Sequence, residues 1–258
     1  MRNSKTLARI RSGGLARCCS LGHYIPAYVS LAARSGFDCI WLDLEHRAFD
    51  TREIQALMAL IRAFDIDCMV RAPTLEKTGL YRYLEEGATG LMIPHVSTPE
   101  MAEALVRASK FPPVGDRGLD NSGLDSGFRE TTNFEAYVEW ANRETFLTVQ
   151  IETPEAVANA GAIAAVPGVD MLFIGPGDLG LRLRQAGDAD GSRLEAAFQT
   201  VADAAKKHGK AWACPVGNAD ELKRRREQGA SFLANGGDFL MLQHGLEELA
   251  RQFEAAGA

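Results

Sequence analysis

Hydrophobic and polar positions divide the chain into two alternating kinds of segment. Short runs of apolar residues, bounded by glycine, proline or polar residues, predict strands that are covered on both faces. These runs occupy residues 15–21, 39–45, 68–73, 90–96, 146–151, 171–174, 211–215 and 232–242. Apolar residues at helical spacing fill the segments 26–34, 51–64, 80–86, 99–110, 154–166, 194–208, 219–228 and 246–253. Strands that alternate with helices in this way predict a parallel sheet.

The junctions between these segments repeat one pattern. A glycine ends a helical segment shortly before a strand at four positions, namely Gly36, Gly87, Gly168 and Gly229. Glycine readily takes the left-handed conformation that terminates a helix, so this is the junction expected of repeated α/β units. About eight such units in 258 residues predict an α/β protein with a single closed (β/α)8 barrel domain, a TIM barrel, over residues 1–258.

Two segments stand apart from the repeating units. Residues 111–133 form the longest irregular stretch, and we expect an ordered loop over one end of the barrel there. The chain closes with a predicted C-terminal helix at residues 244–256. The first predicted strand is not followed by GxGxxG, so no dinucleotide-binding fingerprint is present.

Composition narrows the choice of partner and compartment. The net charge is −6 and the charged residues are interspersed, which argues against nucleic acid or an anionic membrane as partner. No apolar run reaches the roughly 20 residues that cross a bilayer. The five cysteines are an odd number without a CxxC spacing, and we expect them to be buried thiols in a reducing compartment. A soluble, cytoplasmic protein is therefore predicted.

Polar and charged residues follow the predicted strands where a barrel carries its chemistry, at the carboxyl ends. They are Asp43, Glu45, His46, Arg71, His95, Gln150, Glu152 and Asp178. Charged groups at the end of a buried strand are costly unless they are paired or bind something. Taken singly, Asp178 could cap a helix, Arg71 could form a structural ion pair, and His46 could simply pack. Together they favour a site, and two carboxylates from neighbouring strands without a cysteine suit a hard divalent cation.

Six motifs in a fixed order also resemble a known family. They are WLDLEH (41–46), VRAP (70–73), EEGATGLMIPHV (85–96), FPPVGDRG (111–118), VQIET (149–153) and FIGPGDL (173–179). In these motifs the chain resembles the HpcH/HpaI family of metal-dependent 2-oxo-acid aldolases, which belongs to the phosphoenolpyruvate/pyruvate superfamily of barrels. The resemblance covers nearly the whole chain.

The resemblance implies roles for the residues that match these motifs. Glu152 and Asp178 would bind a divalent metal cation, Mg²⁺, Mn²⁺ or Co²⁺. His46, oriented by Asp43, would be the catalytic base acting with a metal-bound water. Arg71 would be catalytic and would contact the oxygen of the bound oxo acid.

The resemblance also implies a pocket and an assembly. Gln150 and the backbone of Gly175, Pro176 and Gly177 would line the substrate pocket. The chain departs from common family residues at Cys18, Cys19, Val114, Gly177 and Gly180, which would lie where the aldehyde binds. Members of the family form homo-oligomers, commonly hexamers, with helix exchange between barrels, and the same is expected here.

The predicted activity is that of a class II aldolase, a carbon–carbon lyase. It would cleave a 4-hydroxy-2-oxo acid reversibly to pyruvate, or a related 2-oxo acid, and an aldehyde through an enolate held on the metal. Lys77 and Lys110 are poorly placed for the alternative imine route.

Three other functions stay open at this point. A lyase of the citrate-lyase-β or malyl-CoA type would need basic residues for the CoA phosphates, and no such cluster is visible in the sequence. A barrel could instead bind a phosphorylated metabolite through Gly236 and Gly237. A non-catalytic barrel would bind an oxo acid without turnover.

Overall fold

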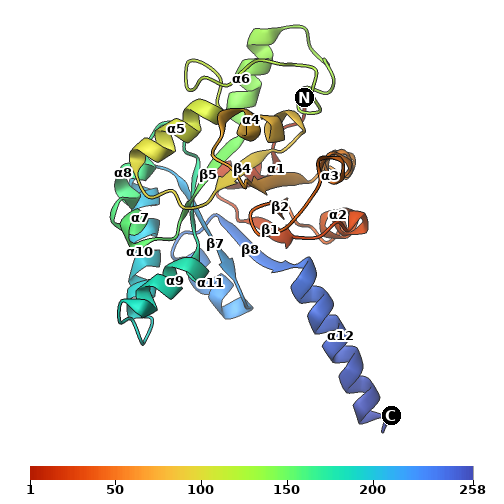
Figure 1. The fold of residues 1–258 in the computed structure, drawn as a ribbon, viewed down its shortest axis with the longest axis vertical. Helices are drawn as coiled ribbons and strands as arrows, with labels where there is room; N and C mark the ends of the chain where they lie inside the picture. Colours follow the sequence, from red (N-terminus) through yellow and green to blue (C-terminus); the bar gives the residue numbers. More distant parts are fainter. Residues whose placement is uncertain (258) are drawn as a thin grey trace.

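The computed structural model describes residues 1–257 and places eight strands in one closed parallel barrel, in sequence order (Figure 1). They are β1 (Ala16–Leu21), β2 (Cys39–Asp43), β3 (Asp67–Arg71), β4 (Gly90–Ile93), β5 (Phe146–Ile151), β6 (Met171–Ile174), β7 (Ala211–Val216) and β8 (Phe232–Gly237). Each strand pairs in parallel with the next, and β8 closes on β1. The predicted (β/α)8 barrel is confirmed.

Helices surround the barrel. Within residues 1–257 they are α1 (Lys5–Arg11), α2 (Pro26–Arg34), α3 (Thr51–Ala63), α4 (Lys77–Glu85), α5 (Pro99–Ser109), α6 (Phe134–Glu144), α7 (Pro154–Ala158), α8 (Ala160–Ala165), α9 (Pro176–Gln185), α10 (Ser192–Lys207), α11 (Ala219–Glu227) and α12 (Asp238–Ala255). The helices α1, α6 and α9 were not predicted, and the single helix predicted at 154–166 is two helices, α7 and α8.

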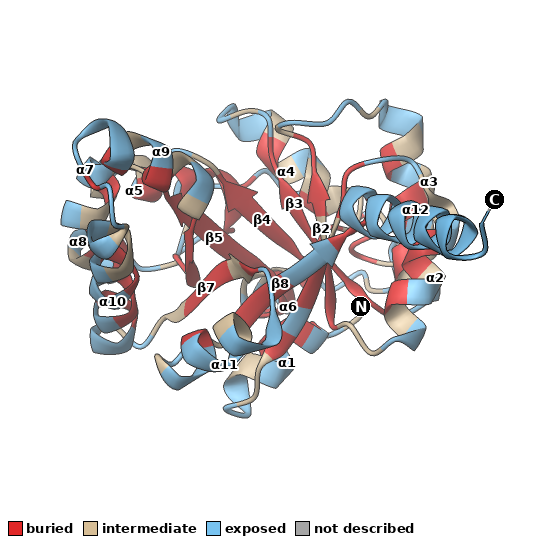
Figure 2. Cartoon of the chain, turned by 90° about the horizontal axis from the view of Figure 1, so that it is seen from below, coloured by how far each residue is buried: buried red, intermediate tan, exposed pale blue. Residues whose placement is uncertain are grey.

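The core has an inner and an outer part, because successive side chains of a strand point to opposite faces. Inside the barrel, one cluster holds Cys18, Cys39, Met69, Phe173 and Phe232 with their neighbours. A larger cluster packs the outer faces of the strands against the helices. Figure 2 shows the strands mostly buried, apart from the end of β8, and the outward helix faces exposed. The five cysteines are free and buried, as predicted.

The amino-terminal helix α1 closes the end of the barrel at which the strands begin. Leu7 of this helix belongs to the inner cluster. The carboxylate of Asp67, which is fully buried, accepts hydrogen bonds from the Ser4 hydroxyl at 2.7 Å and the Thr6 amide at 2.8 Å, and Arg2 pairs with it at 2.6 Å. This end of the barrel is therefore filled, and the opposite end carries the site.

The long loop 111–133 is irregular and packs beside α4, where the Asp125 amide donates to the Glu85 carbonyl at 3.3 Å. Its Arg117 donates to Asp125 at 3.0 Å within the loop, and Lys77 at the start of α4 pairs with Asp116 at 2.6 Å. Val114 packs against Gly168, just before β6 begins, so this residue does not lie at the mouth that carries the site. The expectation that Val114 lies where the aldehyde binds is wrong for the site of the same chain.

The C-terminal helix α12 begins at Asp238, six residues before the predicted start at residue 244. The apolar run Phe239–Leu242 was assigned to the last strand, but Gly236 has a φ of 77° and β8 ends at the next residue, Gly237. The helix points away from the barrel (Figure 1), and its apolar side chains are exposed. They are Phe239, Leu240, Met241, Leu242, Leu246, Leu249 and Phe253.

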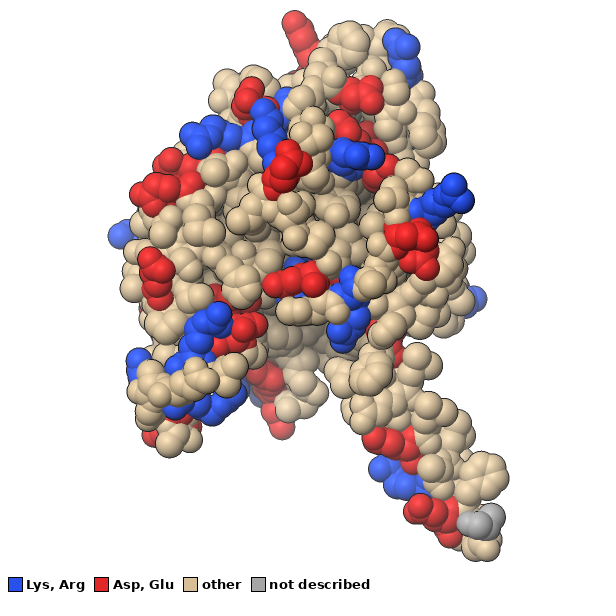
Figure 3. Space-filling model, in the orientation of Figure 1, with Lys and Arg blue, Asp and Glu red and all other residues tan. Residues whose placement is uncertain are grey.

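The surface agrees with the interspersed charges of the sequence. On the face shown in Figure 3, acidic and basic side chains alternate over the barrel without a large patch of one sign. Within residues 1–257, no helix combines the length and the apolar character needed to cross a membrane.

Candidate active site

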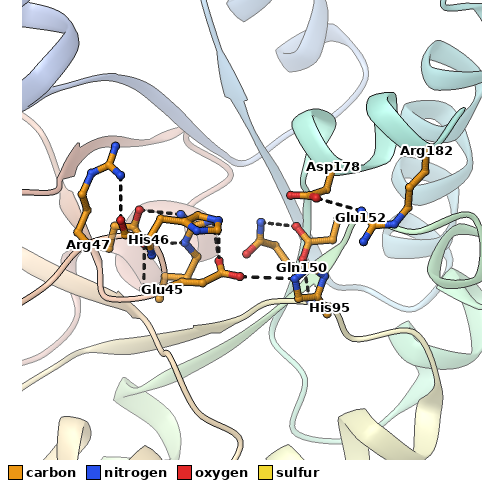
Figure 4. Close-up of polar contacts among 10 residues, drawn as sticks. Glu45, His46, Arg47, His95, Gln150, Glu152, Asp178 and Arg182 are labelled. Carbon is orange, nitrogen blue, oxygen red and sulfur yellow. Dashed lines mark hydrogen bonds and ion pairs between the residues drawn. The ribbon is translucent and has the colours of Figure 1, made fainter. Parts of the chain in front are cut away.

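The predicted site residues gather at the carboxyl ends of β2 to β6 (Figure 4). Asp43 is the last residue of β2 and Arg71 the last residue of β3, and these two positions are paired in the register of the sheet. Gln150 is in β5, and Glu152 follows that strand. Asp178 lies in the first turn of α9, directly after β6. The barrel thus brings together residues that are up to 135 positions apart.

Arg71 is the central cation of one half of the site. Its Nε and Nη2 donate to the two oxygens of Asp43 at 2.9 and 2.7 Å, and its Nη1 lies 3.0 Å from Glu45 Oε2. The guanidinium also lies over the ring of Trp41, with 4.8 Å between its carbon and the ring centroid. Burial opposes the ionisation of Asp43, but the hydrogen bonds and charge of Arg71 outweigh it and hold the pKa of Asp43 below its ordinary value.

His46 presents an exposed ring beside this pair. Its Nε2 is 3.6 Å from Glu45 Oε2, and 57% of its side chain is exposed. Asp43 contacts the backbone of His46 and not its ring, because Asp43 Oδ1 accepts from the His46 amide at 3.3 Å and from the Glu45 amide at 3.1 Å. Asp43 therefore holds the turn that carries the histidine, while Glu45 is the carboxylate next to the imidazole.

Glu152 is the central carboxylate of the other half. Its Oε1 accepts from the His95 amide at 2.7 Å, and its Oε2 accepts from Gln150 Nε2 at 2.8 Å. Burial raises the pKa of Glu152, and the neighbouring carboxylates of Glu45 and Asp178 raise it further against the opposing effect of His95. This carboxylate therefore lies where a cation would be strongly stabilising.

His95 joins the two halves of the site, and the sequence analysis assigned it no role. Its Nδ1 is 3.0 Å from Glu152 Oε1 and its Nε2 is 3.5 Å from Glu45 Oε1. Its φ of 57° lies in the left-handed region, which is uncommon for a residue other than glycine and is found at functional sites. Only its position after the fourth strand marked it in the sequence.

Asp178 is the more exposed of the two predicted metal ligands. Its Oδ1 accepts from Arg182 Nη1 at 3.0 Å, one helical turn later in α9. The side chain of Asp178 is 46% exposed, compared with 3% for Glu152. Arg182 was not predicted to belong to the site. The signal in the sequence is its position four residues after Asp178, a spacing that allows an ion pair within a helix.

The donors present fit a hard divalent cation. Within residues 1–257, no group of three or more His, Cys, Asp and Glu side chains is arranged to hold a metal ion alone. Glu152 and Asp178 offer two carboxylates, which would leave coordination positions for water and substrate. Asp43, Glu45, Glu152 and Asp178 face only the guanidinium groups of Arg71 and Arg182, so two negative charges stay uncompensated when the histidines are neutral.

Two further features shape the space around Glu152. The Gln150 Oε1 atom is buried without a hydrogen-bond partner, which is costly unless a ligand supplies a donor or a positive charge. A Cβ atom at Gly175 would lie 2.5 Å from Glu152 Oε2, so only glycine fits there. Both observations are consistent with a site built to receive a further group at this carboxylate.

The chain is similar in sequence to known proteins. A sequence model of the HpcH/HpaI aldolase/citrate lyase family matches residues 21–245. The chain is 35% identical over 248 residues to the hydroxypyruvate/pyruvate aldolase of Pseudomonas aeruginosa, covering 95% of this chain and 91% of that protein. It is 34% identical over 237 residues to the 5-keto-4-deoxy-D-glucarate aldolase of Klebsiella pneumoniae, covering 92% and 90%.

A solved structure is similar along the whole chain. The crystal structure of the HpcH/HpaI aldolase from Desulfitobacterium hafniense DCB-2 superposes with a TM-score of 0.90 at 29% identity, and the match covers 96% of each chain. The two sequence relatives are named as aldolases, and aldolases are carbon–carbon lyases. The prediction that the chain is an enzyme of this class is confirmed.

The glycine beside Glu152 provides a direct test of the site geometry. Replacing Gly175 by Ala would force Glu152 or the strand end to move, and we expect this overpacking to lower the free energy of unfolding by about 1–3 kcal/mol. Gly177→Ala is the matched control, because a Cβ there meets nothing within 4 Å. Urea unfolding of both variants measures the difference. Equal stability of the two variants would show that the contact with Glu152 imposes no constraint.

Proposed function

The chain belongs to the HpcH/HpaI aldolase/citrate lyase family, and from this premise we propose that it is a divalent-metal-dependent class II aldolase. It cleaves a 4-hydroxy-2-oxo acid reversibly to an aldehyde and pyruvate or a closely related 2-oxo acid. Relatives named for hydroxypyruvate, pyruvate and 5-keto-4-deoxy-D-glucarate support a nucleophile of this kind. Mg²⁺, Mn²⁺ and Co²⁺ are the candidate metals.

One observation carries the proposal. A proton acceptor and a fixed cation, His46 and Arg71, lie on one side of a carboxylate pair, Glu152 and Asp178, that has unbalanced negative charge. Aldol cleavage needs these functions together, because one group must accept the proton of the C4 hydroxyl while others stabilise the enolate that forms as the C3–C4 bond breaks.

Glu152 and Asp178 would hold the metal, which supplies Lewis-acid stabilisation for the 1-carboxylate and the 2-oxo group of the substrate when bound. Arg71 contributes a fixed positive charge near the 2-oxo oxygen. Its contacts with Asp43 and Glu45 keep the guanidinium rigid, so little reorganisation is needed as negative charge develops.

His46 accepts the C4 hydroxyl proton in the cleavage direction. The electrons of the O–H bond then form the aldehyde carbonyl, those of the C3–C4 bond form the C2–C3 double bond, and the π electrons of the C2 carbonyl pass to the 2-oxo oxygen. Glu45, 3.6 Å from His46 Nε2, stabilises the imidazolium that results. Protonation of the enolate at C3 completes pyruvate, and the reverse sequence gives aldol addition.

The exposed helix α12 supports an oligomeric enzyme. Leu242, Leu246, Leu249 and Phe253 recur at helical spacing, and Leu246 and Phe253 are 66% and 67% exposed. Exposed apolar surface of this kind marks an interaction site. We propose that it packs on a neighbouring copy of the chain, in the homo-oligomer with helix exchange, commonly a hexamer, that the family resemblance implies.

The assembly can be tested with one charge placed on α12. Leu246→Glu puts a carboxylate in the apolar stripe, and we expect light scattering after size exclusion to show a smaller species than the wild-type oligomer. His244→Glu is the matched control on the opposite face of the helix, and it should leave the mass unchanged. A monomeric wild type, or an oligomer unaffected by Leu246→Glu, would contradict the proposal.

The catalytic assignment separates proton transfer from metal binding. His46→Ala should lower kcat for cleavage of a 4-hydroxy-2-oxo acid by roughly 10²–10⁴-fold, the usual contribution of a positioned base. Titration calorimetry should show Mn²⁺ binding retained in this variant. Glu152→Ala and Asp178→Ala should lose both cleavage and Mn²⁺ binding.

A second histidine provides the control for this experiment. His208 ends α10 at the opposite end of the barrel, so His208→Ala should cleave at the wild-type rate. Normal cleavage by His46→Ala would show that His46 is not the proton acceptor. Normal Mn²⁺ affinity in both Glu152→Ala and Asp178→Ala would show that these carboxylates do not bind the metal.

A further inference from the structure

An ion pair occupies one of the two carboxylates that would hold the metal, because Arg182 pairs with Asp178 at 3.0 Å. Both residues belong to α9, and Arg182 follows Asp178 by about one helical turn. We propose that Arg182 is a built-in counter-ion of the metal site, which neutralises Asp178 in the metal-free enzyme and lowers the affinity for the divalent cation. The inference rests on the proposed function and concerns the regulation of the same site.

Arg182 is the less firmly held of the two arginines that face the cluster. Arg71 contacts two carboxylates, and its side chain is only 10% exposed. Arg182 meets Asp178 with one nitrogen, and the Arg182 side chain is 38% exposed. Within residues 1–257, no other carboxylate lies within 4.0 Å of the Arg182 guanidinium, and no other group accepts a hydrogen bond from it. Since an exposed ion pair of this kind adds little to stability, Arg182 can leave Asp178 at low cost.

The charge of Arg182 acts on the metal site through Asp178. Burial is the larger cause of the raised pKa of Glu152, and the negative charge of Asp178 raises it further, so the two carboxylates interact. While Arg182 is paired, this part of the site carries the charge of one carboxylate instead of two. A divalent cation that binds at both carboxylates must either displace the guanidinium or bind beside a positive charge. Either way the arginine opposes metal binding.

Helix geometry explains why this arginine, and not its neighbour, reaches the site. Pro176 begins α9 and puts Asp178 in the first turn, and a base four residues after an acid lies on the same face of a helix. Figure 4 shows Arg182 extending to Asp178 at the edge of the cluster away from His46. Arg184 lies on a different face of α9, beside Gly180, where a Cβ would be 3.2 Å from Arg184 Nη1.

Three roles of the Asp178–Arg182 pair predict different metal affinities. If the pair only stabilises α9, loss of the arginine weakens the helix and leaves metal affinity unchanged. If Arg182 orients Asp178 for the metal, loss of the arginine weakens metal binding. The counter-ion role predicts tighter binding instead. The direction of the change in the dissociation constant therefore distinguishes the three.

The test measures Mn²⁺ binding to metal-free protein by titration calorimetry, without substrate. Arg182→Met keeps much of the aliphatic side chain and removes the charge, and we expect it to lower the Kd for Mn²⁺ about 3–10-fold, as for the loss of one ion pair and one nearby positive charge. Arg182→Gln is a second neutral variant and should show the same gain. Arg182→Lys keeps the charge and should stay close to the wild-type Kd.

Arg184→Met is the matched control, because it removes the same charge from the same helix on a face that does not meet Asp178. It should bind Mn²⁺ with the wild-type Kd. Raising the KCl concentration should bring the Kd values of wild type and Arg182→Met closer together, since salt screens both the ion pair and the repulsion. The gain in affinity should be similar for Mn²⁺, Co²⁺ and Mg²⁺, because the three ions carry the same charge.

The outcomes separate this inference from the proposed function. Mn²⁺ binding by folded Arg182→Met and Arg182→Gln that is equal to or weaker than that of wild type would overturn the inference and leave the aldolase function intact. The same gain in Arg184→Met would also overturn it, because the effect would then belong to the net charge of α9. Failure of the wild type itself to bind Mn²⁺ would instead overturn the metal site and with it the proposed function.

Discussion

The pairing of Arg71 with Asp43 and Glu45 is the interaction on which the rest of the site depends. Three charged groups at the end of buried strands would each cost several kcal/mol if left unpaired. The two-pronged contact with Asp43 and the third contact with Glu45 satisfy the guanidinium and fix its plane over Trp41. Asp43 Oδ1, which accepts from Arg71 Nε, also accepts from the His46 amide and so holds the turn that carries this histidine. The fixed cation and the base are thus positioned by one carboxylate.

The half of the site that contains Glu152 and Asp178 carries an excess of negative charge. Glu152 is buried and accepts from one backbone amide and one side-chain amide, and its pKa is raised first by burial and then by the carboxylates that lie close to it. Glu152 directly follows β5, in which every residue is buried, and its own side chain is only 3% exposed, so water does little to stabilise its charge. A Cβ at Gly175 would lie 2.5 Å from Glu152 Oε2, so glycine allows the backbone after β6 to approach this carboxylate closely. A divalent cation would relieve the repulsion that the fold imposes.

Much of the fold was predictable from local patterns, because buried strands and amphipathic helices differ in their apolar spacing. The helix α9 was not predicted, although Pro176 suits the first turn of a helix. The start of α12 was missed because an apolar run predicts a strand or an exposed helix equally well. Only the conformation at Gly236 and the contacts of Asp238 decide between them.

It was easier to predict which residues gather at the strand ends than to predict which of their atoms are in contact. A parallel barrel brings its strand ends to one mouth, so position predicted which side chains lie together there. The family resemblance then implied catalytic or metal-binding roles for Asp43, His46, Arg71, Glu152 and Asp178. Which atoms touch was not predictable: Asp43 reaches the backbone of His46, and His95 links two carboxylates through both ring nitrogens.

The central claim is that a divalent metal and this cluster stabilise an enolate of pyruvate. The most direct measurement is exchange of the pyruvate C3 hydrogens in deuterated water, followed by mass spectrometry on protein stripped of metal and then supplied with Mn²⁺, Co²⁺ or Mg²⁺. The account predicts exchange only after a metal is added, without any aldehyde present. Folded protein that gives no exchange with any of the three metals would contradict it.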